Sequence, residues 1–124
     1  GVKKTFAGRE YVFVDGGMAD NPRYALYKAK YEAMLANKMN EQADTTYTVA
    51  GKCCESGDML VMDAKLPKAE QGDLLLVSST GAYNYSMSSN YNRLPKLPVV
   101  FVKDGTSRLV VKGETLEDLI RQDI

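Results

Sequence analysis

The sequence predicts a mainly β fold, a Greek-key-like β-barrel or sandwich with one long helix and short helical turns. Several short runs of β-branched and aromatic residues are bounded by Gly, Pro, Asn or Asp, which is typical of strands joined by turns. One segment carries apolar residues at three- and four-residue steps, which is typical of a helix. The 124 residues fit a single domain, 1–124, because most domains have about 100–150 residues.

The first elements are a strand and a helix. Residues 11–15 are β-branched and aromatic and precede two glycines, so they predict a strand that ends in a loop. A helix is then expected with Asn21 as N-cap and Pro22 as its first residue, running to about Met39. Its apolar stripe consists of Leu26, Ala29, Ala33 and Ala36.

After this helix the period changes to two. Residues 45–50 alternate and predict a strand, whereas residues 59–62 are a short apolar run near a loop. Residues 73–78 predict a buried strand behind a turn. The polar and aromatic residues 80–86 predict a turn or a short helix.

The C-terminal part predicts a hairpin and a last short helix. Two apolar runs, 98–102 and 108–112, flank an Asp-Gly pair, which is a strong hairpin signal. Thr115 and Asp118 have the spacing of a capping box variant, which opens a helix.

Composition excludes several classes of function. Sixteen Lys and Arg balance sixteen Asp and Glu, which argues against a free-standing nucleic-acid binder. Histidine is absent, which rules out Ser-His-Asp and Cys-His catalysis and His-ligated zinc within this chain. No apolar run reaches the length of a membrane span, and the N-terminus lacks the features of a secretory signal. The cysteines are only the neighbours Cys53 and Cys54, so we expect a reducing, cytoplasmic setting.

The start of the predicted helix is a candidate anion site. Arg23 lies in its first turn, and Tyr27 follows one turn later on the same face. A guanidinium can hold a carboxylate with two parallel hydrogen bonds, to which a phenol can add a third. Spacing alone favours the plainer alternative, in which Arg23 pairs with a nearby acid and Tyr27 belongs to the core.

The loop 51–58 gathers a thiol, a carboxylate and a hydroxyl between glycines. A cysteine here could act as a proton donor or nucleophile, and Glu55 could receive a substrate ammonium. The alternative is a tight turn with a small buried cysteine, a role that suits Cys53. A metal site is weakly indicated, because the usual Cys-x-x-Cys spacing is missing, and we expect none.

The segment 81–92 is too polar for a core strand and too aromatic for an ordinary linker. Tyr83 could stack on a flat ligand or donate a hydrogen bond to it. The alternative is a polar surface loop held in place by its tyrosines.

Together these segments resemble the diaminopimelate decarboxylase family, over roughly residues 12–120. The matching motifs occur in the family's order and with its approximate spacing. They are GGMADNPRYALY at 16–27, CESGD at 54–58, GAY at 81–83, SMSSNYN at 86–92 and GETLEDL at 113–119.

The resemblance implies the C-terminal β-domain of an alanine-racemase-like, fold-type III enzyme that uses pyridoxal 5'-phosphate. The N-terminal (β/α)8 barrel, which carries the Schiff-base lysine and the phosphate loop, would lie outside this chain. The complete enzyme would convert meso-diaminopimelate to L-lysine and CO2 in the last step of lysine biosynthesis, as a homodimer with shared active sites. The fragment alone is expected to be inactive.

The resemblance also implies roles for single residues. Arg23 and Tyr27 match residues that hold the distal carboxylate of the substrate, and Glu55 matches the acid that binds its distal ammonium. Cys54 matches the residue offered to the partner's active site as a proton donor. Tyr83 matches the tyrosine near the cofactor phosphate and the substrate. Ser56 is expected to lie behind the residues that contact the substrate and to support them.

The chain departs from the family pattern in places that carry no assigned role. Tyr24 stands where the family usually has proline, Lys52 and Cys53 replace a Gly-Pro-type lead, and residues 92–98 differ from the usual Arg-Pro-Arg-Pro pattern.

Two other functions stay open. The first is a related decarboxylase of another basic amino acid, such as carboxynorspermidine. The second is a non-catalytic β module for dimerisation. A substrate without a distal carboxylate would have no need of Arg23, which separates the first alternative. Neither nucleic acid nor membrane is expected as a partner.

Overall fold

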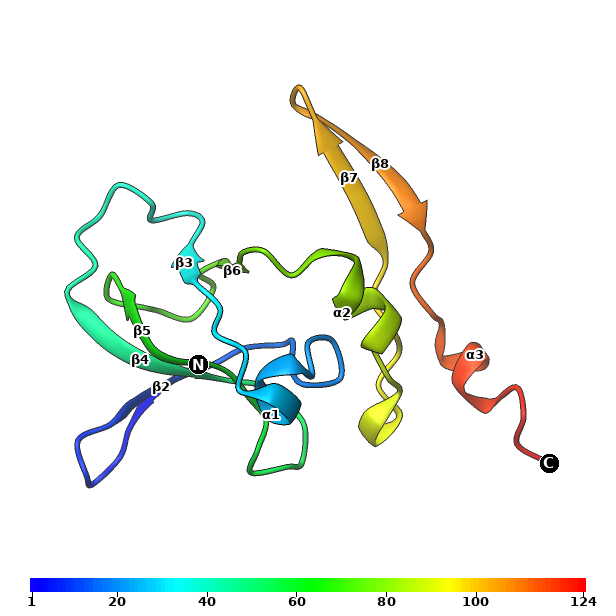
Figure 1. Cartoon of the computed structure of the whole chain (residues 1–124), viewed down its shortest axis with the longest axis horizontal. Helices are drawn as coiled ribbons and strands as arrows, with labels where there is room; N and C mark the ends of the chain where they lie inside the picture. The colour runs from blue at the N-terminus through cyan, green and yellow to red at the C-terminus, as the bar shows by residue number, and fades with distance from the viewer.

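The computed structural model describes all residues, 1–124, as three open β-sheets with short helices between them (Figure 1). The strands are β1 Val2–Lys4, β2 Glu10–Phe13, β3 Ala33–Leu35, β4 Thr45–Ala50, β5 Met59–Leu66, β6 Leu75–Val77, β7 Val99–Lys103 and β8 Thr106–Val111. The helices are α1 Arg23–Tyr27, α2 Gly81–Met87, the 3₁₀ turn η1 Tyr91–Arg93 and α3 Leu116–Ile120. No helix is both long enough and apolar enough to cross a membrane.

The main sheet has four strands in the order β1-β2-β4-β5. The pairs β1–β2 and β4–β5 are antiparallel, whereas β2 and β4 are parallel, with Phe13 opposite Ala50. Parallel neighbours need a crossover connection, and here residues 14–44 supply it with α1 and β3. The carboxyl ends of β2 and β4 therefore lie side by side, and so do the loops that leave them.

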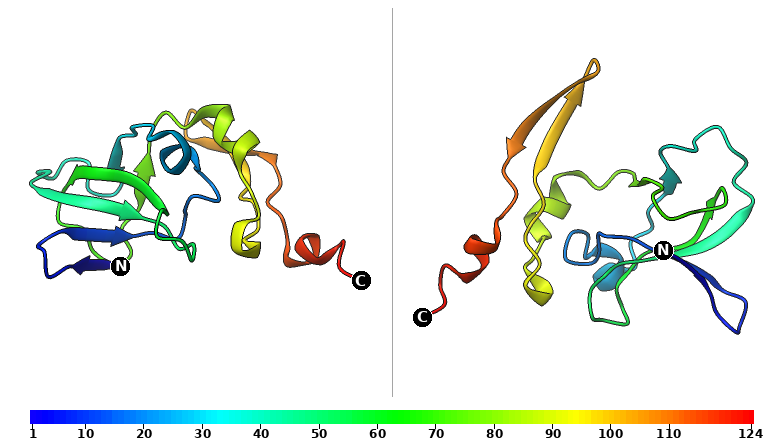
Figure 2. Two further views of the ribbon diagram at one scale, coloured as in Figure 1. Left: turned by 60° about the horizontal axis from the view of Figure 1, so that its bottom comes forward. Right: turned by 180° about the vertical axis from the view of Figure 1, so that it is seen from behind.

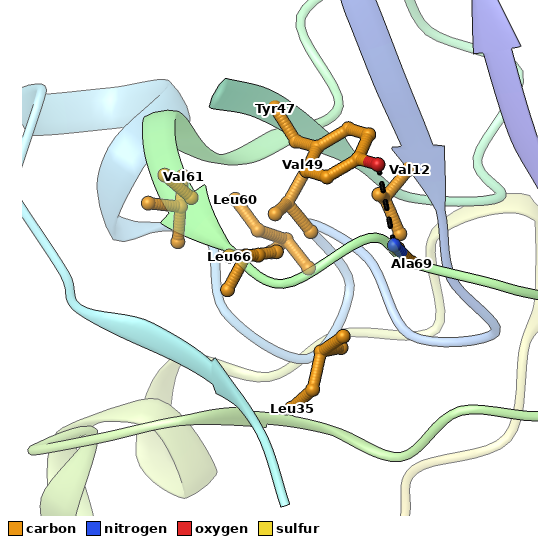
Figure 3. Close-up of a cluster of buried hydrophobic side chains, with 9 residues drawn as sticks. Val12, Leu35, Tyr47, Val49, Leu60, Val61, Leu66 and Ala69 are labelled. Carbon is orange, nitrogen blue, oxygen red and sulfur yellow. Dashed lines mark hydrogen bonds between the residues drawn. The ribbon is translucent and has the colours of Figure 1, made fainter. Parts of the chain in front are cut away.

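The core lies between this sheet and the small β3–β6 sheet (Figure 3). Val49 and Leu66 are completely buried, and Leu35 of β3 covers them from the other side. Tyr47 is also buried, and its hydroxyl accepts a hydrogen bond from the Ala69 N–H at 3.2 Å. This bond satisfies the one polar group that the ring would otherwise bury without a partner.

Several predicted elements are confirmed. The strand at 45–50 is β4, the strand predicted at 11–15 overlaps β2, and the run at 59–62 is the start of the longer β5. Segment 80–86 forms the short helix α2. The hairpin β7–β8 turns at Asp104 and Gly105 with φ of 50° and 72°, as its Asp-Gly pair requires, and Thr115 and Asp118 form both bonds of the capping box.

The predicted long helix is wrong. The helix α1 ends at Tyr27, because Lys28 adopts a left-handed conformation with φ of 56° that stops helical hydrogen bonding. The predicted stripe does not form one buried face, since Leu26 is 61% exposed and Ala33 belongs to β3. Pairing with β6 and burial of Leu35 in the core therefore override the helical spacing. The predicted cap is partly right, since the Asn21 side-chain oxygen accepts a hydrogen bond from the Arg23 N–H at 3.3 Å.

The mainly β class is confirmed, but the predicted barrel is wrong, because the sheets are open and do not close on themselves. The hairpin β7–β8 and the helix α3 stand apart from the four-stranded sheet (Figure 1 and the right view of Figure 2). The strand predicted as buried at 73–78 is only partly so, since Leu74 is 65% and Leu76 is 47% exposed. The chain exposes 8860 Å². A compact monomer of 13.7 kDa exposes about 6,600 Å², so about 2,300 Å² is uncovered in excess.

Candidate functional site

The three segments that sequence analysis singles out meet at one junction. The segment 16–27 leaves the sheet after β2, and the loop 51–58 leaves it after the parallel neighbour β4. Backbone and side-chain hydrogen bonds then join them to each other and to segment 81–92. They run from Lys52 N–H to Gly16 O (3.2 Å), Met18 N–H to Asp58 Oδ1 (2.6 Å), Ser89 N–H to Ala19 O (2.9 Å) and Cys54 N–H to Asn92 Oδ1 (2.8 Å).

Asp58 holds the loop 51–58 in place. Its side chain is buried, and its two oxygens accept hydrogen bonds from the N–H groups of Met18 and Cys53, at 2.6 and 2.7 Å. The backbone passes so close that both nearby glycines are required. A Cβ on Gly51 would lie 2.2 Å from an Asp58 carboxylate oxygen, and one on Gly17 would lie 2.8 Å from it. Gly17 and Gly51 are therefore needed because they let two loops pass close to the carboxylate of Asp58.

The two adjacent thiols have different environments. Cys53 is half-buried, and burial raises the pKa of its thiol. Cys54 is exposed, and its N–H donates to the Asn92 side chain. The structure therefore gives the role of a small, inert, partly buried cysteine to Cys53 and leaves the thiol of Cys54 accessible.

Glu55 is exposed at the tip of the same loop. One of its carboxylate oxygens accepts a hydrogen bond from the Gly57 N–H at 3.0 Å and lies 3.5 Å from the Ser56 hydroxyl, which donates to it. The second oxygen makes no hydrogen bond or ion pair within the chain. Glu55 can therefore accept a cation from outside while its loop neighbours orient it.

Arg23 and Tyr83 come together across the junction. The guanidinium carbon of Arg23 lies 5.2 Å from the centre of the Tyr83 ring, within the range of a cation–π contact. Arg23 forms no ion pair, and its buried Nε has no hydrogen-bond partner. The alternative in which Arg23 pairs with a nearby acid is therefore wrong. So is a core position for Tyr27, which is 64% exposed.

Sequence reasoning missed the polar residues that build the junction. Asp58 and Asn92 were within the quoted motifs without a role, and their contacts join positions about forty residues apart. Asp20 accepts a hydrogen bond from the Gly17 N–H, and burial raises the pKa of its carboxyl. Asn21 and Asn84 are buried, and each keeps one amide atom without a partner. The only signal for these residues in the sequence was the high frequency of Gly, Asn and Asp in the three segments. That frequency does not show which residues form hydrogen bonds with each other.

A groove of 1520 Å³ lies between the four-stranded sheet and the hairpin β7–β8. Mainly apolar residues line it, among them Val12, Leu75, Val99 and Val111. Arg23, Cys54 and Glu55 do not line it, but Gly17, Asp20 and Asn84 do, so the groove adjoins the polar junction. The chain has no cluster of three side chains suited to hold a metal ion.

Comparisons with known proteins show the family to which the chain belongs. A profile described as "Pyridoxal-dependent decarboxylase, C-terminal sheet domain" matches residues 1–81. The chain is 60% identical over 116 residues to diaminopimelate decarboxylase of Bacillus subtilis, covering 94% of this chain and 26% of that protein. It thus spans about a quarter of the length of the curated relatives it matches.

Solved structures share the fold over nearly the whole chain. Diaminopimelate decarboxylase from M. jannaschii in co-complex with L-lysine superimposes with a TM-score of 0.91 and 35% identity, covering 100% of this chain and 28% of that one. The enzyme from Helicobacter pylori complexed with L-lysine gives a TM-score of 0.85 and 38% identity, covering 98% and 29%.

Proposed function

Because this chain belongs to the pyridoxal-dependent decarboxylases, as their C-terminal sheet domain, we propose that it is the C-terminal part of a diaminopimelate decarboxylase. The whole enzyme releases CO2 from meso-2,6-diaminopimelate and forms L-lysine. The chain supplies residues that bind the end of the substrate away from the reaction, and a residue for the partner's active site. An N-terminal (β/α)8 barrel outside residues 1–124 supplies the remainder.

One observation carries this proposal: Arg23, at the junction, has no acid partner within the chain. A partly buried guanidinium with an unpartnered Nε is costly unless an anion completes it. A substrate with a carboxylate and an ammonium at its distal end satisfies Arg23 of one subunit and Glu55 of its neighbour. The distal carboxylate distinguishes diaminopimelate from L-lysine, whose distal end carries only the ammonium.

The distal carboxylate is assigned to Arg23 and Tyr27. The guanidinium provides parallel N–H donors that match a carboxylate, and the exposed Tyr27 hydroxyl, four residues on, adds a donor. The face of Tyr83 holds the guanidinium from one side through the cation–π contact, which reduces the freedom it loses on binding. The distal ammonium is assigned to Glu55, with Ser56 supporting its carboxylate.

Proton delivery is assigned to Cys54. Its thiol is exposed, so it can enter a pocket formed by a second subunit, and Sγ–H supplies the proton to the carbon that has lost CO2. This role makes the homodimer obligatory, with each active site completed by the loop 51–58 of the neighbour. Because both cysteines are free thiols, we keep a reducing, cytoplasmic setting as part of the proposal.

The residues present fit pyridoxal 5'-phosphate. Tyr83 is 68% exposed, and its hydroxyl makes no hydrogen bond within the chain, so it is available to a phosphate oxygen or to the substrate. When bound, the cofactor supplies an electron-withdrawing pyridinium that accepts the electron pair left by the departing CO2. The lysine that attaches the cofactor is assigned to the barrel.

A substrate panel tests the proposal and separates the alternatives. The full-length protein that carries this chain, purified with pyridoxal phosphate, is given meso-diaminopimelate, carboxynorspermidine, L-lysine and L-ornithine, and CO2 release is measured. We expect kcat/KM to be at least about 100-fold higher for diaminopimelate, because the other substrates lack one of its distal groups. Preference for carboxynorspermidine would support the related decarboxylase. No turnover by a stable, cofactor-loaded dimer would support a non-catalytic module.

A further inference from the structure

We infer that Asp58 and Asn92 are positioning residues that aim the Cys54 thiol, an inference that rests on the proposed function. Each supplies a side-chain oxygen to one of two successive backbone amides. Asp58 Oδ2 accepts from the Cys53 N–H at 2.7 Å, and Asn92 Oδ1 accepts from the Cys54 N–H at 2.8 Å. The two acceptors come from different parts of the chain: Asp58 ends the loop 51–58, and Asn92 lies in η1.

Holding two successive amides limits the direction of the side chain that follows. A residue has only two soft backbone angles, so fixing the N–H groups of Cys53 and Cys54 removes most of the freedom between them. The Cα–Cβ bond of Cys54 then starts in a set direction. The same carboxylate of Asp58 accepts a hydrogen bond from the Met18 N–H at 2.6 Å. The direction of the Cys54 side chain is therefore fixed relative to the segment that leads into α1 and Arg23. The direction of the proton donor, which serves the neighbour's active site, is thereby fixed relative to the arginine that binds substrate in the chain's own site.

The two positioning residues differ in how they are held. Asp58 is 2% exposed, and its oxygens have backbone donors only, so its carboxylate has no role in contact with substrate. Asn92 is exposed and has φ of 56°, a left-handed conformation that Asn and Gly adopt most readily. A glycine at position 92 keeps this backbone and removes the oxygen. An aspartate keeps an oxygen acceptor and tolerates the same conformation.

The test compares Asn92→Gly and Asn92→Asp in the full-length enzyme with meso-diaminopimelate as substrate. We expect Asn92→Gly to lower kcat about 10- to 100-fold, because misplacing a reacting group by about 1 Å costs up to about 100-fold. KM is expected to stay within about 3-fold, since the arginine and the glutamate that bind substrate are untouched. Asn92→Asp is expected to retain kcat within about 3-fold, because its oxygen still accepts the amide.

A second background shows whether the effect passes through the thiol. In a Cys54→Ala enzyme, which keeps only residual turnover, Asn92→Gly is expected to change kcat by less than about 2-fold, because residues that act through one another are not additive. Asp58→Asn is expected to lower kcat as well. It replaces one of the two carboxylate oxygens by an NH2 group, which faces a backbone N–H and cannot accept a hydrogen bond from it. Asp73→Asn is the matched control: it alters a carboxylate of the Lys38 cluster outside the junction and is expected to leave kcat unchanged.

The outcomes separate this inference from the proposed function. Parental kcat in Asn92→Gly, an equal loss in Asn92→Asp, or an undiminished loss in the Cys54→Ala background would each overturn the positioning role while leaving the decarboxylase activity standing. If Asp58→Asn fails to fold, the two Asn92 variants still decide. An unaltered enzyme that does not decarboxylate diaminopimelate would overturn the proposed function, and this inference with it.

Discussion

Replacing Arg23 by alanine tests the assignment on which the proposed substrate depends. The change removes a guanidinium that has no acid partner in the chain and a buried Nε without a hydrogen bond. The cation–π contact with Tyr83 at 5.2 Å is lost as well. Because the variant breaks no ion pair inside the domain, most of its effect is expected on the bound substrate and not on folding.

The expected magnitude follows from the bonds at stake. A hydrogen bond to a charged group contributes about 1.5–3 kcal/mol, and Arg23 can form two parallel bonds to a carboxylate. Because the side chain is only partly buried, solvent reduces the sum, and we expect a loss of about 2–4 kcal/mol in kcat/KM for diaminopimelate. That corresponds to about 30- to 1,000-fold, since each 1.4 kcal/mol is tenfold.

The assay is lysine formation from meso-diaminopimelate by the full-length enzyme, with kcat and KM measured separately. Arg9→Ala is the matched control: it removes an arginine that donates to Thr48 on the main sheet at 3.2 Å, away from the junction. We expect its kcat/KM to stay within about 2-fold of the parent. A loss below about 0.5 kcal/mol for Arg23→Ala, with both variants folded, would refute the role of Arg23.

Three further predictions concern the fold. Gly51→Ala should lower the free energy of unfolding by about 1–3 kcal/mol, because its Cβ would meet the Asp58 carboxylate at 2.2 Å; urea titration measures this, and an unchanged midpoint would contradict the close approach. The hydrogen bond from Lys38 lowers the pKa of Asp73 from 3.8 to about 2, so its stabilising effect is present above 3.8 and is lost as the pH falls toward about 2. Asp73→Asn should therefore weaken the acid dependence of stability in that window, and an identical acid titration would refute the linkage. The isolated chain 1–124 should self-associate and bind a hydrophobic dye, because its open sheets leave about 2,300 Å² uncovered in excess. Sedimentation velocity that finds only monomer at about 100 μM would contradict this expectation.

The elements that sequence analysis predicted well are those decided by neighbouring residues. An Asp-Gly pair between apolar runs is enough to specify the turn between β7 and β8, and the capping box acts within one helical turn. The strand β4 matches its predicted bounds, although its last four residues are all buried and do not alternate. Each of these signals acts within a few residues, and in this chain no distant contact overrides it.

The predictions that failed depended on distant or absent partners. The apolar spacing between Leu26 and Ala36 suits a helix, but Leu35 gains more by entering the core beside Val49 and Leu66. The closed barrel was expected because the strands are numerous, yet their pairing leaves three separate sheets. Closure needs pairing partners for the free edges, and residues 1–124 do not supply them.

Sequence analysis identified the segments that carry the candidate site, but it did not predict how they are arranged in space. The residue types at Arg23, Cys54, Glu55 and Tyr83 indicated binding and proton transfer, and family resemblance supplied their roles. The meeting of their segments could not be read from spacing, because it depends on the parallel pairing of β2 with β4 and on the hydrogen bond between Asp58 and the Met18 N–H. Neither of these contacts can be recognised from the residues of one segment alone.

The parallel pairing of β2 with β4 has a consequence for how such enzymes diversify. Phe13 and Ala50 stand opposite each other in the sheet, so the two loops beyond them have a fixed separation at their roots. Insertions or exchanges beyond those roots alter the tips without shifting the scaffold, because strand register is specified by the buried residues behind them. This edge of the sheet is therefore where grafting loops from decarboxylases of other amino acids would change substrate preference at the lowest risk to folding.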